Sequence, residues 1–336
     1  MIKVIKMSEP LIKAVNIKKY FPVRMSFTGS LKGEKQKWVK AVDDISIDIY
    51  PKEILGLAGE SGSGKTTFGR TLIRLIEPTA GSMIYKGVDI FKLKGSELKN
   101  YRRKLQIIFQ DPYDAINPRL TIRDVVAEGL LVNKLVSKDK VDEAVAGALE
   151  DVKLTPPEEF INRYPHELSG GQRQRVAIAR ALVLRPDFIV ADEPVSMLDV
   201  SIRAEVLNVM LDLKEKYGIT FLFITHDLAL AKHMSDRIAV MYLGKVVELS
   251  DSEKLIDNPL HPYTQALIAA IPIPDPSAHK AEVKIKGEIP SPVNPPSGCR
   301  FHPRCPYAFD RCKVEEPKLK EVEPGHFVAC HLYDKS

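Results

Sequence analysis

Residues 59–66 of the chain, GESGSGKT, match the phosphate-binding pattern G-x-x-x-x-G-K-[ST] at every fixed position. In this pattern glycines let backbone N–H groups curl around a phosphate, a lysine adds positive charge, and a threonine hydroxyl reaches Mg²⁺. The residues predicted to contact phosphates are Gly59, Ser61, Gly62, Ser63, Gly64, Lys65, Thr66 and Thr67. Because the apolar run 54–58 precedes the loop and a helical pattern follows it, a chance Gly/Ser turn is the weaker interpretation.

Two acidic residues follow the apolar run 188–191. In this position Asp192 is predicted to hold Mg²⁺, and Glu193 is predicted to polarise the attacking water as a general base. On its own, an Asp-Glu pair after a strand is more often a solvated turn than a catalytic pair. The phosphate loop upstream favours the catalytic interpretation.

A second glycine-rich loop, LSGGQ at 168–172, precedes a strongly helical run over 173–184. The loop therefore stands where a helix begins, and a helix N-terminus attracts anions. The residues predicted to form this second anion site are Ser169, Gly170, Gly171 and Gln172. The alternative is an ordinary N-cap at Ser169 followed by a glycine turn. One nucleotide does not need both loops from one subunit, so the two loops together predict a nucleotide shared between two subunits.

These motifs make the sequence resemble the ATP-binding subunit of an ATP-binding-cassette (ABC) transporter, whose signature motif is LSGGQ. The resemblance runs from about residue 15 to residue 250. Further positions match the Q-loop, the D-loop and the switch histidine of the family, namely Gln110, Asp199 at the end of 196–199, and His226. Met197 is a departure, because the family usually has a small residue there.

The resemblance implies an enzyme that hydrolyses ATP with Mg²⁺ as cofactor. The catalytic residues it implies are Glu193, His226, Lys65 and Gln110, and the magnesium ligands are Thr66, Gln110 and Asp192. Tyr20 or Phe21 is expected to stack on adenine, and the spacing favours Phe21. In this family two cassettes pack head to tail, so each ATP lies between the phosphate loop of one subunit and the LSGGQ loop of the other.

Other segments resemble the ATPases of dipeptide and oligopeptide importers, a subfamily that includes nickel importers. They are FQDPY at 109–113, NPR at 117–119, YPHE at 164–167, HPYT at 261–264 and the tail segment 289–306. This resemblance implies a second ATPase subunit, identical or related, two transmembrane permease subunits, and an extracytoplasmic substrate-binding protein that acts indirectly. Coupling helices of the permeases would dock in a groove beside Gln110, which places the chain peripherally at the cytoplasmic face of the membrane.

Three alternatives stay open for the function. Peptides and nickel are both possible cargoes, because other subunits select the cargo. A non-transport cassette ATPase is a second alternative, although two cassettes in one chain or a long coiled-coil insertion would be typical of it. A P-loop kinase or GTPase, the third, would lack LSGGQ and a histidine after the later strand.

The elements that must position these residues indicate an α/β fold, a P-loop NTPase core of the ABC-ATPase type with a helical subdomain. Strands are predicted by β-branched and aromatic runs at 39–49, 54–58, 105–109, 188–191, 221–225 and 238–243. No strand pattern occurs from about 111 to 186, where apolar residues recur at helical spacing, so this stretch is predicted to be the helical subdomain. We expect the ATPase domain to span 1–256 and a small, irregular metal-cluster extension to span 257–336.

The predicted cluster residues are Cys299, Cys305, Cys312 and Cys330, spaced C-x5-C-x6-C-x17-C. A reducing cytosol disfavours disulfides and the absence of a tight C-x2-4-C pair disfavours zinc, so a [4Fe–4S] cluster is favoured. Zinc, with help from His302, His326 or His331, stays open, as do unliganded or disulfide-linked cysteines. Two proline-rich stretches, 271–276 and 289–296, predict extended linkers.

The composition excludes several classes of protein. With 336 residues, 44% of them hydrophobic and 28% charged, the chain is predicted to be globular with two domains or one large domain and an appendage. Uninterrupted apolar runs stop at about six residues and residues 1–10 lack a secretory signal, so we expect neither a membrane span nor export. Basic and acidic residues number 49 and 44, a balance that does not indicate a nucleic-acid partner.

Overall fold

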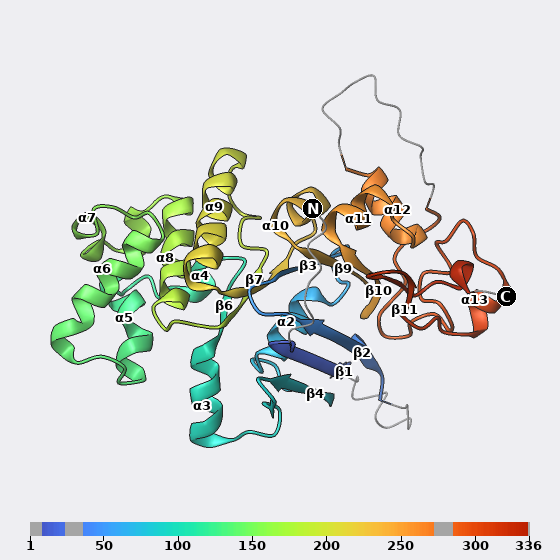
Figure 1. Cartoon of the computed structure of the whole chain (residues 1–336), viewed down its shortest axis with the longest axis horizontal. Helices are drawn as coiled ribbons and strands as arrows, with labels where there is room; N and C mark the ends of the chain where they lie inside the picture. The colour runs from blue at the N-terminus through green and yellow to red at the C-terminus, as the bar shows by residue number, and fades with distance from the viewer. Residues whose placement is uncertain (1–8, 24–35, 272–284, 335–336) are drawn as a thin grey trace, which may run out of the picture. The chain divides into compact units, whose positions relative to one another are not determined.

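The computed structural model describes residues 9–23, 36–271 and 285–334, which fold into two compact units (Figure 1). Unit 1 includes Tyr50–Ile54 and Lys92–Ile224, and unit 2 includes Pro10–Ile49, Leu55–Phe91 and the chain from Thr225 onward. Residues 1–8 and 272–276, which carry expectations for the N-terminus and the first linker, lie outside the described residues. Among the helices of the described ranges, none has the length and apolar character needed to span a bilayer.

Unit 1 is built on three parallel strands, β6 (Leu105–Ile108), β7 (Phe188–Asp192) and β8 (Thr220–Ile224). β7 pairs with β6 on one side and with β8 on the other. Every residue of β7 and β8 is buried, as expected for parallel strands covered on both faces and therefore apolar along their whole length. Asp192 thus ends a buried strand, as the sequence predicted for this carboxylate.

Helices make up most of the rest of unit 1, and residues 112–182 contain helices without a strand (Figure 1). The elements are α3 (Gly95–Lys104), α4 (Pro112–Ala115), α5 (Ile122–Val132), η1 (Lys138–Lys140), α6 (Val141–Asp151), α7 (Glu158–Ile161), η2 (Pro165–Glu167), α8 (Gly170–Leu182) and α9 (Val200–Tyr217). α5, α6 and α8 pack on one another and bury Val125, Val145 and Val176. The helical stretch belongs to the same compact unit as β6–β8, so its status as a subdomain remains a prediction.

Unit 2 contains two groups of hydrogen-bonded strands. One is an antiparallel sheet in the order β2-β1-β4-β5, and the other has the order β11-β12-β10-β9-β3, in which β3 and β9 run parallel. The strands are β1 (Ile12–Pro22), β2 (Trp38–Ile49), β3 (Ile54–Ala58), β4 (Ala80–Tyr85), β5 (Val88–Asp89), β9 (Arg237–Tyr242), β10 (Lys245–Asp251), β11 (Lys320–Glu323) and β12 (His326–Val328). The helices are α2 (Lys65–Leu72), α10 (Leu228–Met234), α11 (Ser252–Asp257), α12 (Pro262–Ala269), α13 (Asp310–Val314) and η3 (His331–Tyr333).

The C-terminal extension joins the second group of strands. β12 pairs antiparallel with β10, where Val328 lies opposite Glu248, and β11 adds a further strand at the edge. The ring of Phe301 packs 5.3 Å from the ring of Tyr242 and 5.4 Å from that of Tyr263, centroid to centroid, and all three rings are fully buried. A domain boundary at residue 256 remains a prediction, but the extension shares its core with the strands that precede it.

Candidate functional site

The phosphate loop connects β3 to α2 in unit 2, and the backbone of its neighbours fixes two of its glycines. Gly59 has φ +148° and Gly64 has φ +105°, conformations that favour glycine. A Cβ at either residue would lie under 3.0 Å from a carbonyl oxygen, that of Met241 in β9 or that of Ala41 in β2. At Gly62, by contrast, a Cβ would meet nothing within 4 Å. The fold therefore demands the first two glycines, and Gly62 lies on the open side of the loop.

Lys65, the first residue of α2, is buried and turns its ammonium group back into the loop. Its Nζ atom donates to the carbonyl oxygens of Gly59 at 2.7 Å and Glu60 at 3.0 Å, and lies 3.4 Å from Ser63 Oγ. Ser61 is exposed, and Thr66 and Thr67 are partly exposed on the first turn of α2. The loop thus carries a buried cation within a shell of its own oxygen atoms.

Unit 1 brings two of the predicted catalytic residues together. Gln110 follows β6 and Glu193 follows β7, and Gln110 Nε2 donates to Glu193 Oε2 at 3.3 Å. The neighbouring Asp192 is 1% exposed. Glu193 has φ +47°, which is uncommon for a non-glycine residue, and its N–H donates to the carbonyl oxygen of Ile224 at 3.0 Å. One amide and two carboxyl groups therefore lie at the carboxyl ends of adjacent parallel strands, where α/β sheets bind ligands.

The LSGGQ loop begins α8 with a capping box. Ser169 Oγ accepts from the N–H of Gln172 at 3.3 Å, and Gln172 Oε1 accepts from the N–H of Ser169 at 3.0 Å. A Cβ at Gly171 would lie under 3.0 Å from the side chain of Ile202, so close packing of α8 on α9 needs this glycine. Both predicted interpretations of the loop are compatible with this geometry, because the capping alternative is realised and Ser169 is also exposed.

Asp199 and His226 are exposed. Asp199 precedes α9 and makes no side-chain cap. It lies between two exposed apolar side chains, Met197 (66% exposed) and Val200 (78% exposed). These neighbours give the D-loop region of unit 1 an apolar surface.

The two aromatic candidates for adenine differ in their surroundings. The Tyr20 hydroxyl donates to the carboxylate of Asp43, and burial followed by this hydrogen bond raises the pKa of Tyr20 above its usual value. Phe21 has the ammonium group of Lys19 at 4.8 Å from its ring centroid. Since consecutive side chains of a strand point to opposite faces, Tyr20 and Phe21 cannot serve the same surface.

The four cysteines of the extension are free, and Cys299, Cys305 and Cys312 each influence Cys330 electrostatically. The N–H of Cys299 donates to the carbonyl oxygen of Cys312 at 2.8 Å. Burial, then the charges of the other cysteines, raises the pKa of Cys299 to about 11 and that of Cys330 to about 12. Among the described residues no three His, Cys, Asp or Glu side chains have the arrangement of a metal site. The predicted metal-cluster domain is therefore not confirmed, and none of the four cysteines forms a disulfide in this structure.

The three histidines that the sequence offered as further zinc ligands use ring nitrogens in other contacts. His302 Nδ1 lies 2.9 Å from the carbonyl oxygen of Cys299, and His331 uses both ring nitrogens, at 2.8 Å from Asp334 and 2.9 Å from the carbonyl oxygen of Glu315. His326 Nε2 lies 2.7 Å from Glu248. These ring nitrogens hold the extension together, so the structure gives no support to their use as zinc ligands.

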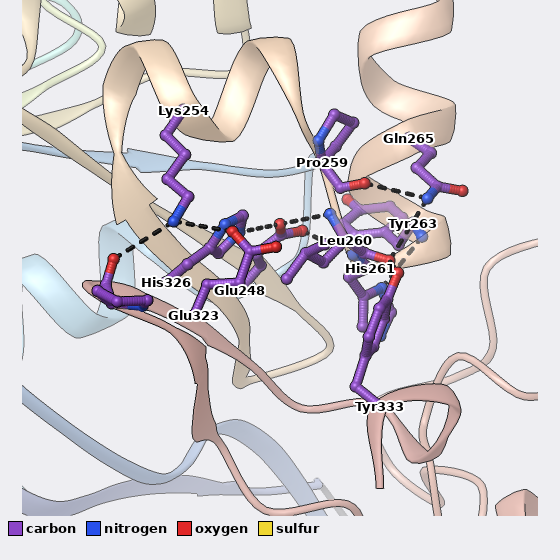
Figure 2. Close-up of polar contacts among 11 residues, drawn as sticks. Glu248, Lys254, Pro259, Leu260, His261, Tyr263, Gln265, Glu323, His326 and Tyr333 are labelled. Atoms are coloured by element: carbon purple, nitrogen blue, oxygen red, sulfur yellow. Dashed lines mark hydrogen bonds and ion pairs between the residues drawn. The ribbon is translucent and has the colours of Figure 1, made fainter. Parts of the chain in front are cut away.

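A fully buried polar network around Glu248 was missed by sequence reasoning. Figure 2 shows its carboxylate among the N–H of Leu260 at 2.7 Å, the N–H of His261 at 2.9 Å and the ring of His326. His261 in turn caps α12, because its Nδ1 accepts from the N–H of Tyr263 at 3.1 Å. The only available signal was a glutamate within the apolar run of β10. The network ties the extension to β10 and to α12.

Comparison with known proteins gives consistent matches along the chain. Residues 42–196 match a family model described as ABC transporter, and residues 247–312 match one described as oligopeptide/dipeptide transporter, C-terminal region. A putative peptide import ATP-binding protein of Brucella ovis is 53% identical over 292 residues, which cover 87% of this chain and 92% of that protein. The oligopeptide transport ATP-binding protein AppF of Bacillus subtilis is 49% identical over 328 residues, which cover 97% and 98%.

A solved structure supports the same fold. The ATP-binding cassette MJ0796, as a dimer in a post-hydrolysis state bound to ADP and Pi, is 29% identical with a TM-score of 0.62. The match covers 72% of this chain and 98% of that one. The α/β phosphate-loop fold expected from the sequence is thereby confirmed.

Proposed function

This chain belongs to the ABC transporter ATPases of the oligopeptide/dipeptide importer type, and from that premise we propose how its residues divide the work. It is an ATPase subunit that energises peptide import. The observation that carries the assignment to residues is the Gln110–Glu193 contact of 3.3 Å beside buried Asp192, in a chain with a complete phosphate loop.

Unit 2 is proposed to supply the phosphate and base contacts. The phosphate contacts are Gly59, Ser61, Gly62, Ser63, Gly64, Lys65, Thr66 and Thr67. Lys65 would exchange its bonds to the loop carbonyls for bonds to phosphate oxygens, which keeps its charge compensated in both states. Phe21 is the proposed adenine-stacking ring, since the hydroxyl of Tyr20 already bonds Asp43. His226 is the proposed contact to the terminal phosphate.

Unit 1 is proposed to supply the hydrolytic groups. Glu193 acts as general base toward the attacking water, and the amide of Gln110, already bonded to that carboxylate, holds it in one orientation. Gln110 and Asp192 of this unit are proposed magnesium ligands, as is Thr66 of unit 2, because Mg²⁺ prefers oxygen ligands of these kinds. Bound Mg²⁺ supplies charge neutralisation on the phosphates.

A second ATPase subunit, identical or related, is proposed to complete each site. The exposed Ser169, with Gly170, Gly171 and Gln172, would contact ATP held by the partner. Asp199, flanked by exposed Met197 and Val200, would lie in the same interface.

Two permease subunits are the proposed membrane partners, with an extracytoplasmic binding protein acting through them. A cavity of about 330 Å³ beside α4 and α5 offers a docking place for a coupling helix. It is lined by Tyr113, Ile116, Leu120, Val125 and Arg180, among others. This arrangement would hold the chain peripherally at the cytoplasmic face. Nickel is the second candidate cargo, because the subfamily that these segments resemble includes nickel importers.

The four cysteines are proposed to bind a [4Fe–4S] cluster, with Zn²⁺ as the alternative. The support is their donor chemistry: sulfur is the ligand that both metals prefer, and the charges of the three other cysteines raise the pKa of Cys330. Burial raises the pKa of Cys299, Cys305 and Cys330, and a bound cation would compensate the charge of the thiolates. Iron, sulfide and zinc content of the full chain, against the same chain with Cys305→Ser, tests the proposal; equal metal content in both would refute it.

Glu193→Gln tests the ATPase assignment. The amide is isosteric but has little basicity, so we expect ATP turnover to fall by ~10² or more while ATP binding is retained. Light scattering with ATP should then detect dimers that the wild type forms only transiently. Turnover within threefold of wild type would remove Glu193 from the base role, and Asp48→Asn, an acidic residue of β2 outside the proposed site, provides the matched control.

A further inference from the structure

Segment 299–305 (CRFHPRC) of the extension contains two buried arginines, Arg300 and Arg304, whose side chains contact residues near the proposed nucleotide site of unit 2. The side chains of Arg300 and Arg304 are 7% and 9% exposed. Buried guanidinium groups require anionic or carbonyl partners, because desolvation of the charge is otherwise costly. The partners of both arginines come from the first hundred residues and from the β9–β10 turn.

Arg304 forms an ion pair with a residue of the phosphate loop, Glu60. Its Nη1 and Nη2 atoms donate to the two carboxylate oxygens of Glu60 at 2.8 and 3.2 Å, a bidentate pair. The N–H of Glu60 donates to the hydroxyl of buried Tyr263 at 2.8 Å, and its carbonyl oxygen accepts from Lys65 Nζ at 3.0 Å. Glu60 is thus held on both sides by residues after position 260, and one of its own atoms holds the loop lysine.

Arg300 reaches the other end of the same site. Its guanidinium donates to the carbonyl oxygen of Leu243 and to the carboxylate of Asp43. Burial alone would raise the pKa of Asp43, but the hydrogen bond from Tyr20 and the charge of Arg300 together lower it, so the carboxylate stays ionised. Tyr20 is the neighbour of Phe21, the proposed adenine-stacking residue.

We propose that Arg300 and Arg304 are positioning residues for ATP. Through them the extension fixes the phosphate loop at Glu60 and, at Asp43, the strand β2 that pairs with the Phe21-bearing strand β1. This inference rests on the proposed ATP site. Arg304 determines where the carbonyl oxygen of Glu60 lies, and that oxygen sets the resting place of the Lys65 ammonium. Arg300 sets the orientation of the strand that carries Phe21, by way of Asp43 and Tyr20.

The test compares ATP binding and turnover in the full-length chain. Arg304→Ala should raise the KM for ATP about tenfold, with kcat changed less than about threefold, because the loop is misplaced for ground state and transition state alike. Arg304→Lys should give an intermediate KM, since an ammonium group cannot form the bidentate pair. Glu60→Arg combined with Arg304→Glu should recover part of the loss. The matched control is Arg311→Ala, an exposed arginine of the same extension, which should behave as wild type.

Direct titration with a fluorescent ATP analogue, next to thermal melting of each variant, separates the outcomes. If Arg304→Ala fails to fold, Glu60→Gln and Arg304→Lys carry the test, because both keep the size of the side chain. A folded Arg304→Ala or Arg304→Lys variant with the affinity of Arg311→Ala would overturn the role of Arg304. A folded Arg300→Ala variant with the ATP affinity of Arg311→Ala would overturn the role of Arg300 in positioning the strand that carries Phe21. Wild-type protein that binds no ATP, or equal binding after Lys65→Ala, would instead refute the proposed function.

Discussion

His261, one of the residues bonded to Glu248 in Figure 2, makes the free energy of unfolding depend on pH. The ring is 1% exposed, and its Nδ1 accepts the N–H of Tyr263 at 3.1 Å. Nε2 must then carry the proton of the neutral ring, and this nitrogen has no partner within the described residues. Burial lowers the pKa of His261 to about 4, against a weaker opposing effect of the Glu248 charge.

The sign of the dependence follows from that lowered pKa. Well above pH 6.5 the ring is neutral in both folded and unfolded chains, and the full stability is present. As pH falls from 6.5 toward 4, the unfolded chain binds a proton that the folded chain excludes, so stability is lost. At 1.36 kcal/mol per pKa unit, the total loss is about 3 kcal/mol, of which about 2 kcal/mol falls between pH 7 and pH 5.

His261→Asn isolates this contribution, because the asparagine oxygen can still cap α12 without titrating. Urea unfolding of both proteins, followed by circular dichroism at pH 7 and pH 5, gives the difference in free energy of unfolding. The loss of ring volume costs the variant the same at both pH values, so its stability relative to wild type should improve by about 2 kcal/mol at pH 5. His166→Asn, at an exposed histidine, is the control. A difference that stays constant with pH would refute the reasoning.

Three further substitutions test the packing of unit 2. Gly64→Ala would bring a methyl group under 3.0 Å from the Ala41 carbonyl oxygen at a φ of +105°, so it should cost more than about 2 kcal/mol in urea unfolding and abolish binding of a fluorescent ATP analogue; wild-type binding would contradict it. Glu248→Ala leaves three buried donors without an acceptor and should lower the free energy of unfolding by about 3–5 kcal/mol in the same assay. A decrease of less than about 1 kcal/mol would be inconsistent with the network. Lys313→Ala breaks an exposed ion pair with Asp310 and should leave the midpoint of urea unfolding unchanged, because solvent screens the pair; a clear shift of the midpoint would mean that the pair is not solvated.

The strands that the sequence predicted best are the buried ones. The runs at 54–58, 188–191 and 238–243 became β3, β7 and β9 with ends displaced by at most one residue. Such strands are apolar on both faces and stop at polar or glycine residues, so composition alone marks them.

β1 was missed because its signal is of another kind. It is an antiparallel strand with lysines on its exposed face, and register shifts between Ala14 and Ile17 and between Lys19 and Tyr20 break the alternation of apolar and polar residues. Strands β10 and β12 were missed for a related reason, since each contains a buried charged or titratable residue, Glu248 or His326. Glu248 and His326 contact each other, but 78 residues separate them in the sequence, so no local pattern could reveal the pair.

The candidate site divides in the same way. Residues within contiguous motifs, such as Lys65 and Glu193, were predicted because spacing along the chain carries the information. Glu60 and Arg304 could not be paired in advance, because 244 residues separate them and only the folded extension brings them together. The spacing of two arginines between two cysteines was visible, but nothing in the sequence indicated what they bind.

Removal of the extension should therefore damage the ATPase part of unit 2 rather than release it intact. A chain that ends at Ile271 leaves the carboxylates of Asp43, Glu60 and Glu248 without their partners Arg300, Arg304 and His326. It also uncovers the rings that pack on Phe301. Carboxylates that the remaining residues still bury then lack their cationic partners, and an unpaired buried charge is costly.

Neutralising the stranded carboxylates separates the two causes of damage. In the truncated chain, the triple substitution Asp43→Asn, Glu60→Gln and Glu248→Gln should raise the melting temperature by several degrees, since three uncompensated charges are removed. The same triple substitution in the full-length chain should lower it, because there the charges are paired. If the truncated chain melts and binds ATP like the full-length protein, the extension is an independent appendage and its buried contacts contribute nothing to the nucleotide site.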